Sequence, residues 1–258
     1  MLKYNLNSHN SLSNQYNEKD LKDKLNLKFM DLINKTTCVG LYDMPRVLSP
    51  RHINIDYLAL YSDKHEYTKT SNTCVCFYEY DKVFDSKISL FNAIYNNDIN
   101  LLKKYKERFK DVSYFISPDY SLCGDVPETI NIYNIFKSRI VSLGLTLLFD
   151  KLVIPNITYA SRKSFEYMLD GLEDCYVVAF STKGSLKNSQ QEELLLEAIK
   201  YTVDHLHNLK QIIVYDVSID NSKVLELFAY VTNKGIEVMI PNNLLKERNI
   251  ILGGKLNG

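Results

Sequence analysis

The chain has 258 residues, and its 31 Lys and Arg residues equal its 31 Asp and Glu residues, so its formal net charge is zero. This balance argues against a protein that works mainly by coating nucleic acid or an anionic membrane, because both modes need a basic excess. The hydrophobic content of 45% is ordinary for a packed globular protein. No apolar run approaches the roughly 20 residues that a membrane-spanning helix needs, so we expect no membrane partner.

The first 20 residues are polar and rich in Asn and Ser. They predict a flexible N-terminal arm over 1–20, followed by a single α/β domain over 21–258. No secretory signal opens the chain. The five cysteines are odd in number and scattered in spacing, which is typical of buried thiols in a reducing compartment. We therefore expect a cytoplasmic protein.

Continuous apolar runs alternate with amphipathic segments along the chain. Strands are predicted at 38–42, 57–61, 74–80, 114–116, 151–156, 175–180, 211–215 and 236–240. Helices are predicted at 18–33, 84–96, 99–109, 128–149, 164–169, 190–209 and 221–233. After residue 240 we expect only a short tail.

Apolar strands separated by helices pair in parallel with right-handed crossovers, so the pattern predicts an α/β fold with a mostly parallel sheet. Eight candidate strands at this length favour a TIM-like barrel, regular or irregular. An open doubly wound sheet is the alternative. Whether residues 21–70 complete a barrel or pack outside it stays open.

Parallel sheets carry their sites at the carboxyl ends of the strands. Polar residues follow the predicted strands at these positions: Asp43, Asp63, Glu79 or Asp81, Asp119, Asn156, Thr182, Asp216 and Asn242. Converging carboxylates either bind Mg²⁺ or Mn²⁺ or separate their pKa values for acid–base work. The plainer interpretation is that Asp and Asn stand there because they favour turns.

Four carboxylates are the candidate catalytic groups: Asp119, Asp81, Asp216 and Asp43. Asp119 leads this set, because its setting SPDYS is unusual for a plain turn and lies at a strand-to-helix junction. Any metal would be Mg²⁺ or Mn²⁺, with Asp119 and Asp81 as its first candidate ligands. The sequence names no other cofactor.

The candidate substrate-binding residues are Ser117, Tyr120, Asn134, Arg139, Asn156, Thr182 and Lys183. Arg139 lies in the long predicted helix and presents either a polar face toward the rim or an ordinary solvated face. Lys183 and the Gly-Ser pair after it precede a helix and could bind an anion, although the full P-loop spacing is absent. No GxSxG, HExxH, GxGxxG or CxxC pair occurs, which excludes the commonest hydrolase, zincin, dinucleotide-binding and zinc-ribbon patterns.

Several motifs resemble, in the same order, an uncharacterised family of bacterial phages, plasmids and other mobile elements. The matching segments are SPDYS at 117–121, DVP at 125–127, YN at 133–134 with Lys137 and Arg139, VIP at 153–155, LDG at 169–171 and STKG at 181–184. The chain departs from the pattern at Val126, where the family has Met, and at Tyr159, where it has Trp. The resemblance implies a mobile-element protein of the bacterial host cytoplasm, and it implies no activity.

Two hypotheses remain. The first is an enzyme that processes nucleic acid or nucleotides at an acidic rim, with metal assistance in one variant. The second is a non-catalytic phage or plasmid protein that binds a host protein or replication-origin DNA, for which a surface rich in Tyr and Asn is suited. Parallel α/β scaffolds with acidic strand ends commonly house sites, so we favour the enzyme.

Overall fold

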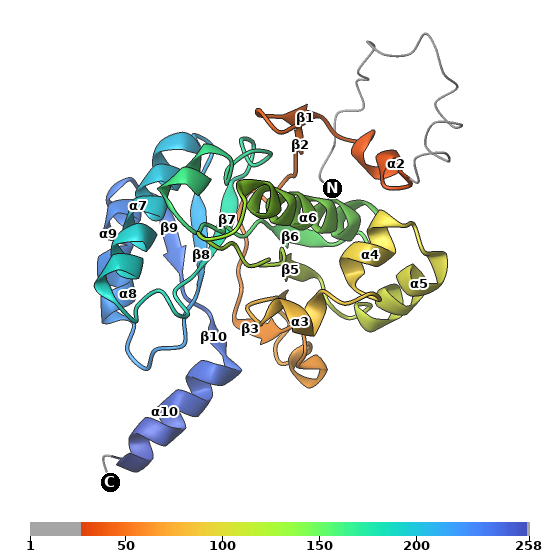
Figure 1. Ribbon diagram of the computed structural model, residues 1–258. Coiled ribbons are helices and arrows are strands. Elements are labelled where there is room, and N and C mark those ends of the chain that lie inside the picture. The colour runs from red at the N-terminus through yellow and green to blue at the C-terminus, as the bar shows by residue number, and fades with distance from the viewer. Residues whose placement is uncertain (1–26, 257–258) are drawn as a thin grey trace.

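The computed structural model describes residues 27–256 and shows a mixed α/β fold with parallel sheets (Figure 1). The arm predicted for 1–20 lies outside the described residues. Five strands pair in parallel in the order β10-β3-β4-β5-β6. They are β3 (Tyr57–Leu60), β4 (Thr73–Cys76), β5 (Tyr114–Ile116), β6 (Leu152–Ile154) and β10 (Asn242–Asn243). Three more parallel strands follow the order β7-β8-β9, namely β7 (Val177–Ser181), β8 (Gln211–Tyr215) and β9 (Glu237–Met239).

Helices surround these strands. The α-helices are α2 (Met30–Ile33), α3 (Asp81–Phe84), α4 (Leu90–Tyr95), α5 (Ile99–Arg108), α6 (Glu128–Leu147), α7 (Ser189–His205), α8 (Ser222–Leu227), α9 (Ala229–Asn233) and α10 (Leu244–Leu256). Two short 3₁₀ helices are η1 (Lys64–Glu66) and η2 (Arg162–Glu166). In Figure 1, α6 covers β5 and β6, α7 to α9 flank β7 to β9, and α10 projects away from the rest.

The two parallel sheets meet after β6. Asn156 forms a parallel bridge with Ala179 of β7. The amide of Ile157 donates to the Ala179 carbonyl at 2.9 Å, and the amide of Ala179 donates to the Pro155 carbonyl at 2.8 Å. At the other end of the chain, β9 runs into β10, whose Asn242 pairs with Tyr57 of β3.

The strands β3, β4, β5, β7 and β8 are largely buried on both faces, which explains their continuous apolar sequences. One set of side chains packs between strands of both sheets and includes Leu58, Cys74, Cys76, Ile116, Ile154, Val177, Ala179, Ile213 and Tyr215. The alternate residues pack with the helices in a larger cluster that includes Val75, Phe115, Val153, Val178, Phe180, Ile212 and Val214. These buried strands therefore place alternate side chains in one or the other of two cores.

The strand predicted at 38–42 is wrong in length and in pairing. Only β1 (Cys38–Val39) is extended, and it pairs antiparallel with β2 (Met44–Pro45) in a hairpin outside the parallel sheets. The chain reverses because Gly40 has a φ of 74° and Asp43 a φ of 50°. Glycine adopts this left-handed conformation freely, and Asp is among the few other residues that tolerate it.

Several helix boundaries also differ from the prediction. Of the helix expected at 84–96, α4 forms only at Leu90–Tyr95, where Ser89 caps its start by accepting a hydrogen bond from the amide of Asn92, and Phe84 is the last residue of the separate helix α3. The helix expected at 221–233 breaks at Phe228, and 164–169 is largely replaced by η2. The predicted tail instead forms β10 and α10. Of the helix expected at 18–33, the described part is helical only at Met30–Ile33.

The strands at 57–60, 114–116 and 211–215 and the helices α5, α6 and α7 confirm the predicted alternation within a few residues. Within residues 27–256, no helix is both long and apolar enough to cross a membrane.

Candidate functional site

Asp119 lies just after β5, where the apolar strand ends at Ile116 and Pro118 prevents its continuation. Its Oδ1 accepts two hydrogen bonds of 2.8 Å, one from Nδ2 of Asn156 and one from the hydroxyl of Thr158. Both donors follow β6, the strand paired with β5. Neighbouring parallel strands thus deliver a carboxylate and its two donors to the same edge.

Burial raises the pKa of Asp119 to about 6, against the lowering effect of the Thr158 hydrogen bond. The nearby Asp81 carboxylate raises it further, while Asn156 and the Lys183 ammonium lower it. A carboxyl with this pKa exchanges its proton near neutral pH. It is therefore suited to general acid–base work.

Two further groups fix the Asn156 amide. The Tyr78 hydroxyl donates to Oδ1 of Asn156 at 2.7 Å. The backbone amide of Asn156 donates to the Ser117 hydroxyl at 2.8 Å. Ser117 also accepts from the hydroxyl of Ser138 on α6 at 3.2 Å. Because both ends of the Asn156 side chain are held, its Nδ2 is aimed at Asp119.

Lys183 joins this network from the loop after β7. Its Nζ donates to the Tyr78 carbonyl at 2.9 Å. The Tyr78 ring stacks on Tyr215 with centroids 4.7 Å apart, so the partner of Lys183 is itself packed in place. The structure thus brings a cation close enough to Asp119 to lower the pKa of its carboxyl.

Asp216 lies after β8 in a separate network. Its Oδ1 accepts from the Thr182 hydroxyl at 2.5 Å, and its Oδ2 accepts from the amide of Ser218 at 3.0 Å. The Lys246 ammonium on α10 lies 3.8 Å from Oδ2, and Asn243 donates to the Asp216 carbonyl at 2.7 Å. Asp216 is 1% exposed. It is therefore placed to hold the Thr182–Lys183 turn rather than to meet a substrate.

Asp81 is at the start of α3 and faces the loop after β5. It accepts from the Ser121 hydroxyl at 2.8 Å and from the Ser121 amide at 3.2 Å. Asn134 on α6 donates to the carbonyl of the same Ser121 at 2.7 Å. Both residues thus hold the SPDYS loop that carries Asp119.

Three candidates lie apart from this edge. Asp43 is in the turn of the β1–β2 hairpin. Arg139 is 1% exposed and donates to the carbonyls of Asp170 at 3.0 Å and Met168 at 2.8 Å, so it stabilises that loop instead of presenting a polar face. The Tyr120 ring packs against Phe84 in the core and carries the Lys137 ammonium 4.1 Å above it.

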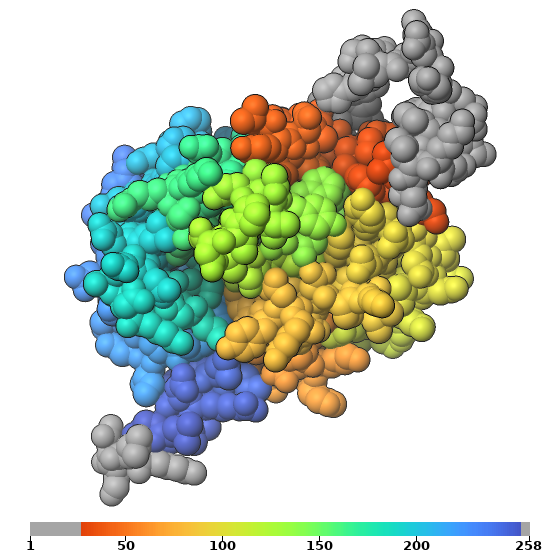
Figure 2. Space-filling model, in the orientation of Figure 1, coloured from red at the N-terminus to blue at the C-terminus, as the bar shows by residue number. Residues whose placement is uncertain are grey.

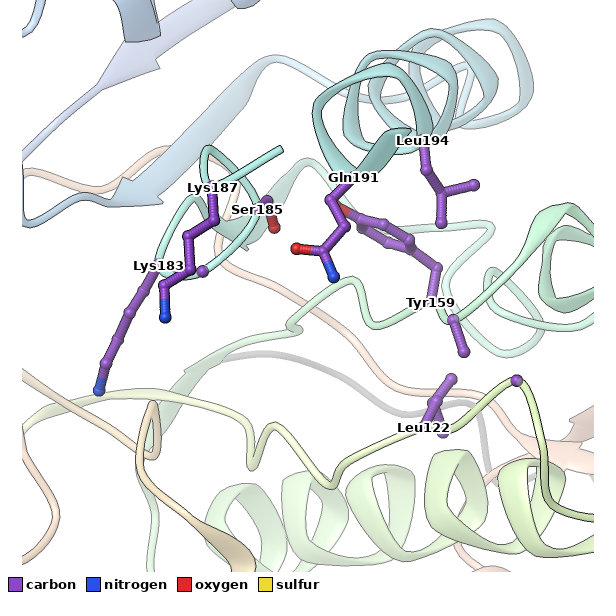
Figure 3. Close-up of a pocket in the computed structure, with 10 residues that line it drawn as sticks. Leu122, Tyr159, Lys183, Ser185, Lys187, Gln191 and Leu194 are labelled. Carbon is purple, nitrogen blue, oxygen red and sulfur yellow. The ribbon is translucent and has the colours of Figure 1, made fainter. Parts of the chain in front are cut away.

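A cavity of about 570 Å³ adjoins Lys183. It lies between the loops after β5, β6 and β7 and the first turns of α7. Its lining residues are Leu122, Gly124, Tyr159, Ala160, Lys183, Gly184, Ser185, Lys187, Gln191 and Leu194 (Figure 3). In Figure 2 the teal surface around the start of α7 faces the yellow-green surface of the loop after β5.

In the described part of the chain, the arrangement of the His, Cys, Asp and Glu side chains does not support a metal site made by protein ligands alone. Within residues 27–256, no three His, Cys, Asp or Glu side chains are close enough to hold one ion. The Asp81 carboxylate raises the pKa of Asp119, and the two carboxylates would be two ligands of an ion that also binds substrate or water.

The sequence alone did not point to four residues of these networks and of the cavity: Tyr78, Thr158, Lys187 and Lys246. Thr158 carries a usable signal, because it follows the rim residue Asn156 by two positions and so shares its side of an extended chain. Lys246 carries none, because its role depends on a helix that the sequence did not predict. Lys187 is separated from its cavity neighbours Leu122 and Tyr159 by long stretches of chain.

The domain of unknown function DUF4417 matches residues 36–241, from just before β1 to just before β10. The chain belongs to the DUF4417 family. This DUF4417 match covers all strands of the candidate site except β10, so the Asp119 network lies within the family domain.

Two phage proteins are similar to this DUF4417 chain. The Gene 1 protein of Mycobacterium phage D29 is 23% identical over 163 residues, which are 61% of this chain and 54% of that protein. The Gene 1 protein of Mycobacterium phage L5 is 26% identical over 103 residues, which are 38% of this chain and 42% of that protein. The chain spans about half the length of these relatives. They support the phage part of the resemblance in the sequence motifs, and they assign no activity.

Proposed function

We propose that this protein is a phage-associated enzyme that processes nucleotides or nucleic acid at the carboxyl ends of its parallel strands. The observation that carries the proposal is the Asp119 carboxyl, whose pKa is raised to about 6 within electrostatic reach of Lys183, a residue that lines a cavity. Acid–base groups with perturbed pKa values in clefts are the usual mark of active sites.

The proposed reaction is hydrolysis of a phosphate ester. Ionised Asp119 takes a proton from water as the water oxygen bonds to phosphorus, and the bond from phosphorus to the leaving oxygen breaks. Asp119 then returns the proton to the leaving oxygen. Lys183 offsets the negative charge of the phosphoryl oxygens. Asn156 and Thr158 position Asp119 and do not react.

Asp216 has a positioning role in this proposal, because it fixes Thr182 directly before Lys183. Asp81 raises the pKa of Asp119 and holds the Ser121 loop. Asp43 lies on the separate hairpin and has no part in the reaction.

We also infer that the two parallel sheets form one irregular barrel. The bridge between Asn156 and Ala179 supports closure on one side, and the continuation of β9 into β10, which pairs with β3, supports it on the other. The shared cluster of alternate side chains would be the barrel interior. In that arrangement residues 27–56 pack outside the ring.

The test is an assay of phosphate release from nucleoside mono-, di- and triphosphates and of cleavage of short oligonucleotides. Wild-type protein is compared with Asp119→Asn, which keeps an oxygen acceptor for Asn156 and Thr158. Asp111→Asn is the matched control, because Asp111 is exposed before the amino end of β5. Parallel assays with Mg²⁺, Mn²⁺ or EDTA test the form of the proposal in which Asp119 and Asp81 of the wild-type protein bind a metal ion.

We expect Asp119→Asn to lower the rate at least 100-fold, the usual order for removing a general base, with Asp111→Asn unchanged. Equal rates in both variants overturn the proposal. Inactivity of the wild type on every substrate also contradicts it and favours the alternative, a non-catalytic protein that binds a host protein or replication-origin DNA. A complex that survives Asp119→Asn would identify that second function.

A further inference from the structure

The cavity beside Lys183 has the size of a small-molecule site. Its volume of about 570 Å³ lies within the roughly 300–1,000 Å³ of typical ligand pockets. Three loops and one helix enclose it, and each contributes side chains (Figure 3). A single nucleotide fits this volume.

The charged residues that line the cavity are all cationic. Lys183 and Lys187 line the cavity, and none of its lining residues is acidic. Figure 3 shows both lysine side chains extending from the 183–187 loop in the same direction, with Ser185 and the Gln191 amide beside them. Within the described residues Lys187 forms no salt bridge, so its charge is not neutralised there. This side of the cavity favours an anion that also accepts hydrogen bonds, as phosphate does.

The loop that carries the two lysines is fixed. The Thr182 hydroxyl is bonded to the buried Asp216, and the Ser185 amide donates to the Thr182 carbonyl at 3.1 Å. Gly184 supplies the turn with a φ of 91°. A loop held in this way keeps both lysines in place, with the Lys183 ammonium bonded to the Tyr78 carbonyl, so the loop loses little further conformational freedom on binding.

The opposite side of the cavity is apolar and aromatic. Leu122 approaches it from the loop after β5 and Leu194 from α7, and Tyr159 presents its ring. The Tyr159 ring is held edge-on by Phe165, with centroids 6.5 Å apart. Aromatic and aliphatic groups of this kind contact the faces of nucleobases, which stack on any π surface.

We propose that this cavity binds a mononucleotide, with the phosphates at Lys183 and Lys187 and the base against Tyr159. This inference rests on the proposed function and names its substrate class. A polymer would need a basic track along its backbone, whereas the cavity supplies two lysines and the whole chain has a net charge of zero. Lys183 lies within electrostatic reach of Asp119, whose pKa it lowers, so a phosphate at Lys183 would lie on the side of the cavity toward the proposed base.

The test is calorimetric titration of the full chain with adenosine 5′-diphosphate. Guanosine 5′-diphosphate, adenosine and inorganic phosphate are titrated separately, so that contributions of base and phosphate are told apart. Lys187→Gln is the main variant, and Lys210→Gln, an exposed lysine before the amino end of β8, is its matched control. Tyr159→Leu tests the aromatic face. Circular dichroism of each variant establishes that it is folded.

We expect a nucleoside diphosphate to bind more tightly than adenosine or phosphate alone. Lys187→Gln should weaken binding about tenfold, as removal of one charge-assisted contact does, and Lys210→Gln should not. Tyr159→Leu should weaken nucleotide binding and leave phosphate binding unchanged. Equal affinities of the wild type, Lys187→Gln and Lys210→Gln overturn the inference.

Two arms separate this inference from the proposed function. We expect Asp119→Asn to bind the nucleotide and fail to hydrolyse it. If the wild type also binds the nucleotide without hydrolysing it, the proposed reaction is wrong and the assignment of the cavity as a nucleotide site stands. A single-stranded oligonucleotide that binds at least tenfold more tightly than every nucleotide, with a steep salt dependence, overturns the mononucleotide assignment in favour of nucleic acid.

Discussion

The hydroxyl of Thr182 and the carboxylate of Asp216 are joined by a 2.5 Å hydrogen bond between the ends of two neighbouring strands, β7 and β8. This bond sets the direction of the chain at Lys183, the next residue. A buried residue on one strand therefore determines where the cation of the candidate site lies.

Replacing Thr182 with Val should lower the free energy of unfolding by about 2 kcal/mol, because a buried hydrogen bond to a charged group is lost. Thr202→Val is the control of identical chemistry. Thr202 is fully buried on α7, and its hydroxyl has no partner among the described residues, so its removal should be neutral or stabilising. Urea unfolding measures both values. Equal losses would show that the Thr182–Asp216 bond is not special.

The activity should depend on pH through Asp119. As a base it works when ionised, so kcat/KM should fall about tenfold per pH unit below its pKa of about 6 and be level above it. Asp81→Asn removes a carboxylate that raises this pKa, and the fall of kcat/KM at acidic pH should therefore move to lower pH. Lys183→Gln removes a positive charge that lowers the pKa of Asp119, and the same fall of kcat/KM should therefore move to higher pH. Shifts with the same sign in both variants would contradict the assignment.

Asp170 should make the stability depend on pH. Burial raises its pKa to about 6, with a further increase from Glu173 and a decrease from Arg139. The folded state therefore binds this proton more tightly than the unfolded state, so its contribution to stability is greatest at low pH and is lost between pH about 4 and about 6. Asp119, raised in the same way, adds to this loss.

Asp170→Asn should thus gain stability over the wild type as the pH rises through that window, measured by urea unfolding at several pH values. Asp111→Asn removes an exposed carboxylate as the control and should run parallel to the wild type. A difference between Asp170→Asn and wild type that stays constant across this pH range would disprove the role of Asp170.

Gly171 joins the β1–β2 hairpin to the rest of the fold. Its φ is 84°, and a Cβ there would lie 2.5 Å from the Pro45 carbonyl oxygen of β2. Gly171→Ala should therefore destabilise by about 3 kcal/mol, from left-handed strain and from the clash with backbone. Gly235→Ala has a similar φ of 75° in open space and should cost only about 1 kcal/mol. Thermal unfolding of the two variants decides whether contact with Pro45 matters.

Part of the site could be predicted from local chemistry. An apolar run stopped by Pro and followed by Asp places Asp119 at a strand end, and the same reasoning brings Asn156, Thr182 and Lys183 to the same edge. It failed for Asp43, because a two-residue strand with a tight turn has the same local appearance as the end of a longer strand. It also failed for Arg139, because helical position does not reveal which carbonyls of a distant loop lie within reach.

The sequence by itself determined the parallel α/β alternation, because strands buried on both faces must be continuously apolar and the helices between them must be amphipathic. Only the tertiary structure decided which polar groups touch. The donors to Asp119 come from another strand, and the cavity of Lys183 and Lys187 is closed by Leu122 and Tyr159 from two other loops. A pKa, a hydrogen bond and a cavity depend on distances between such groups, and those distances exist only once the strands have paired.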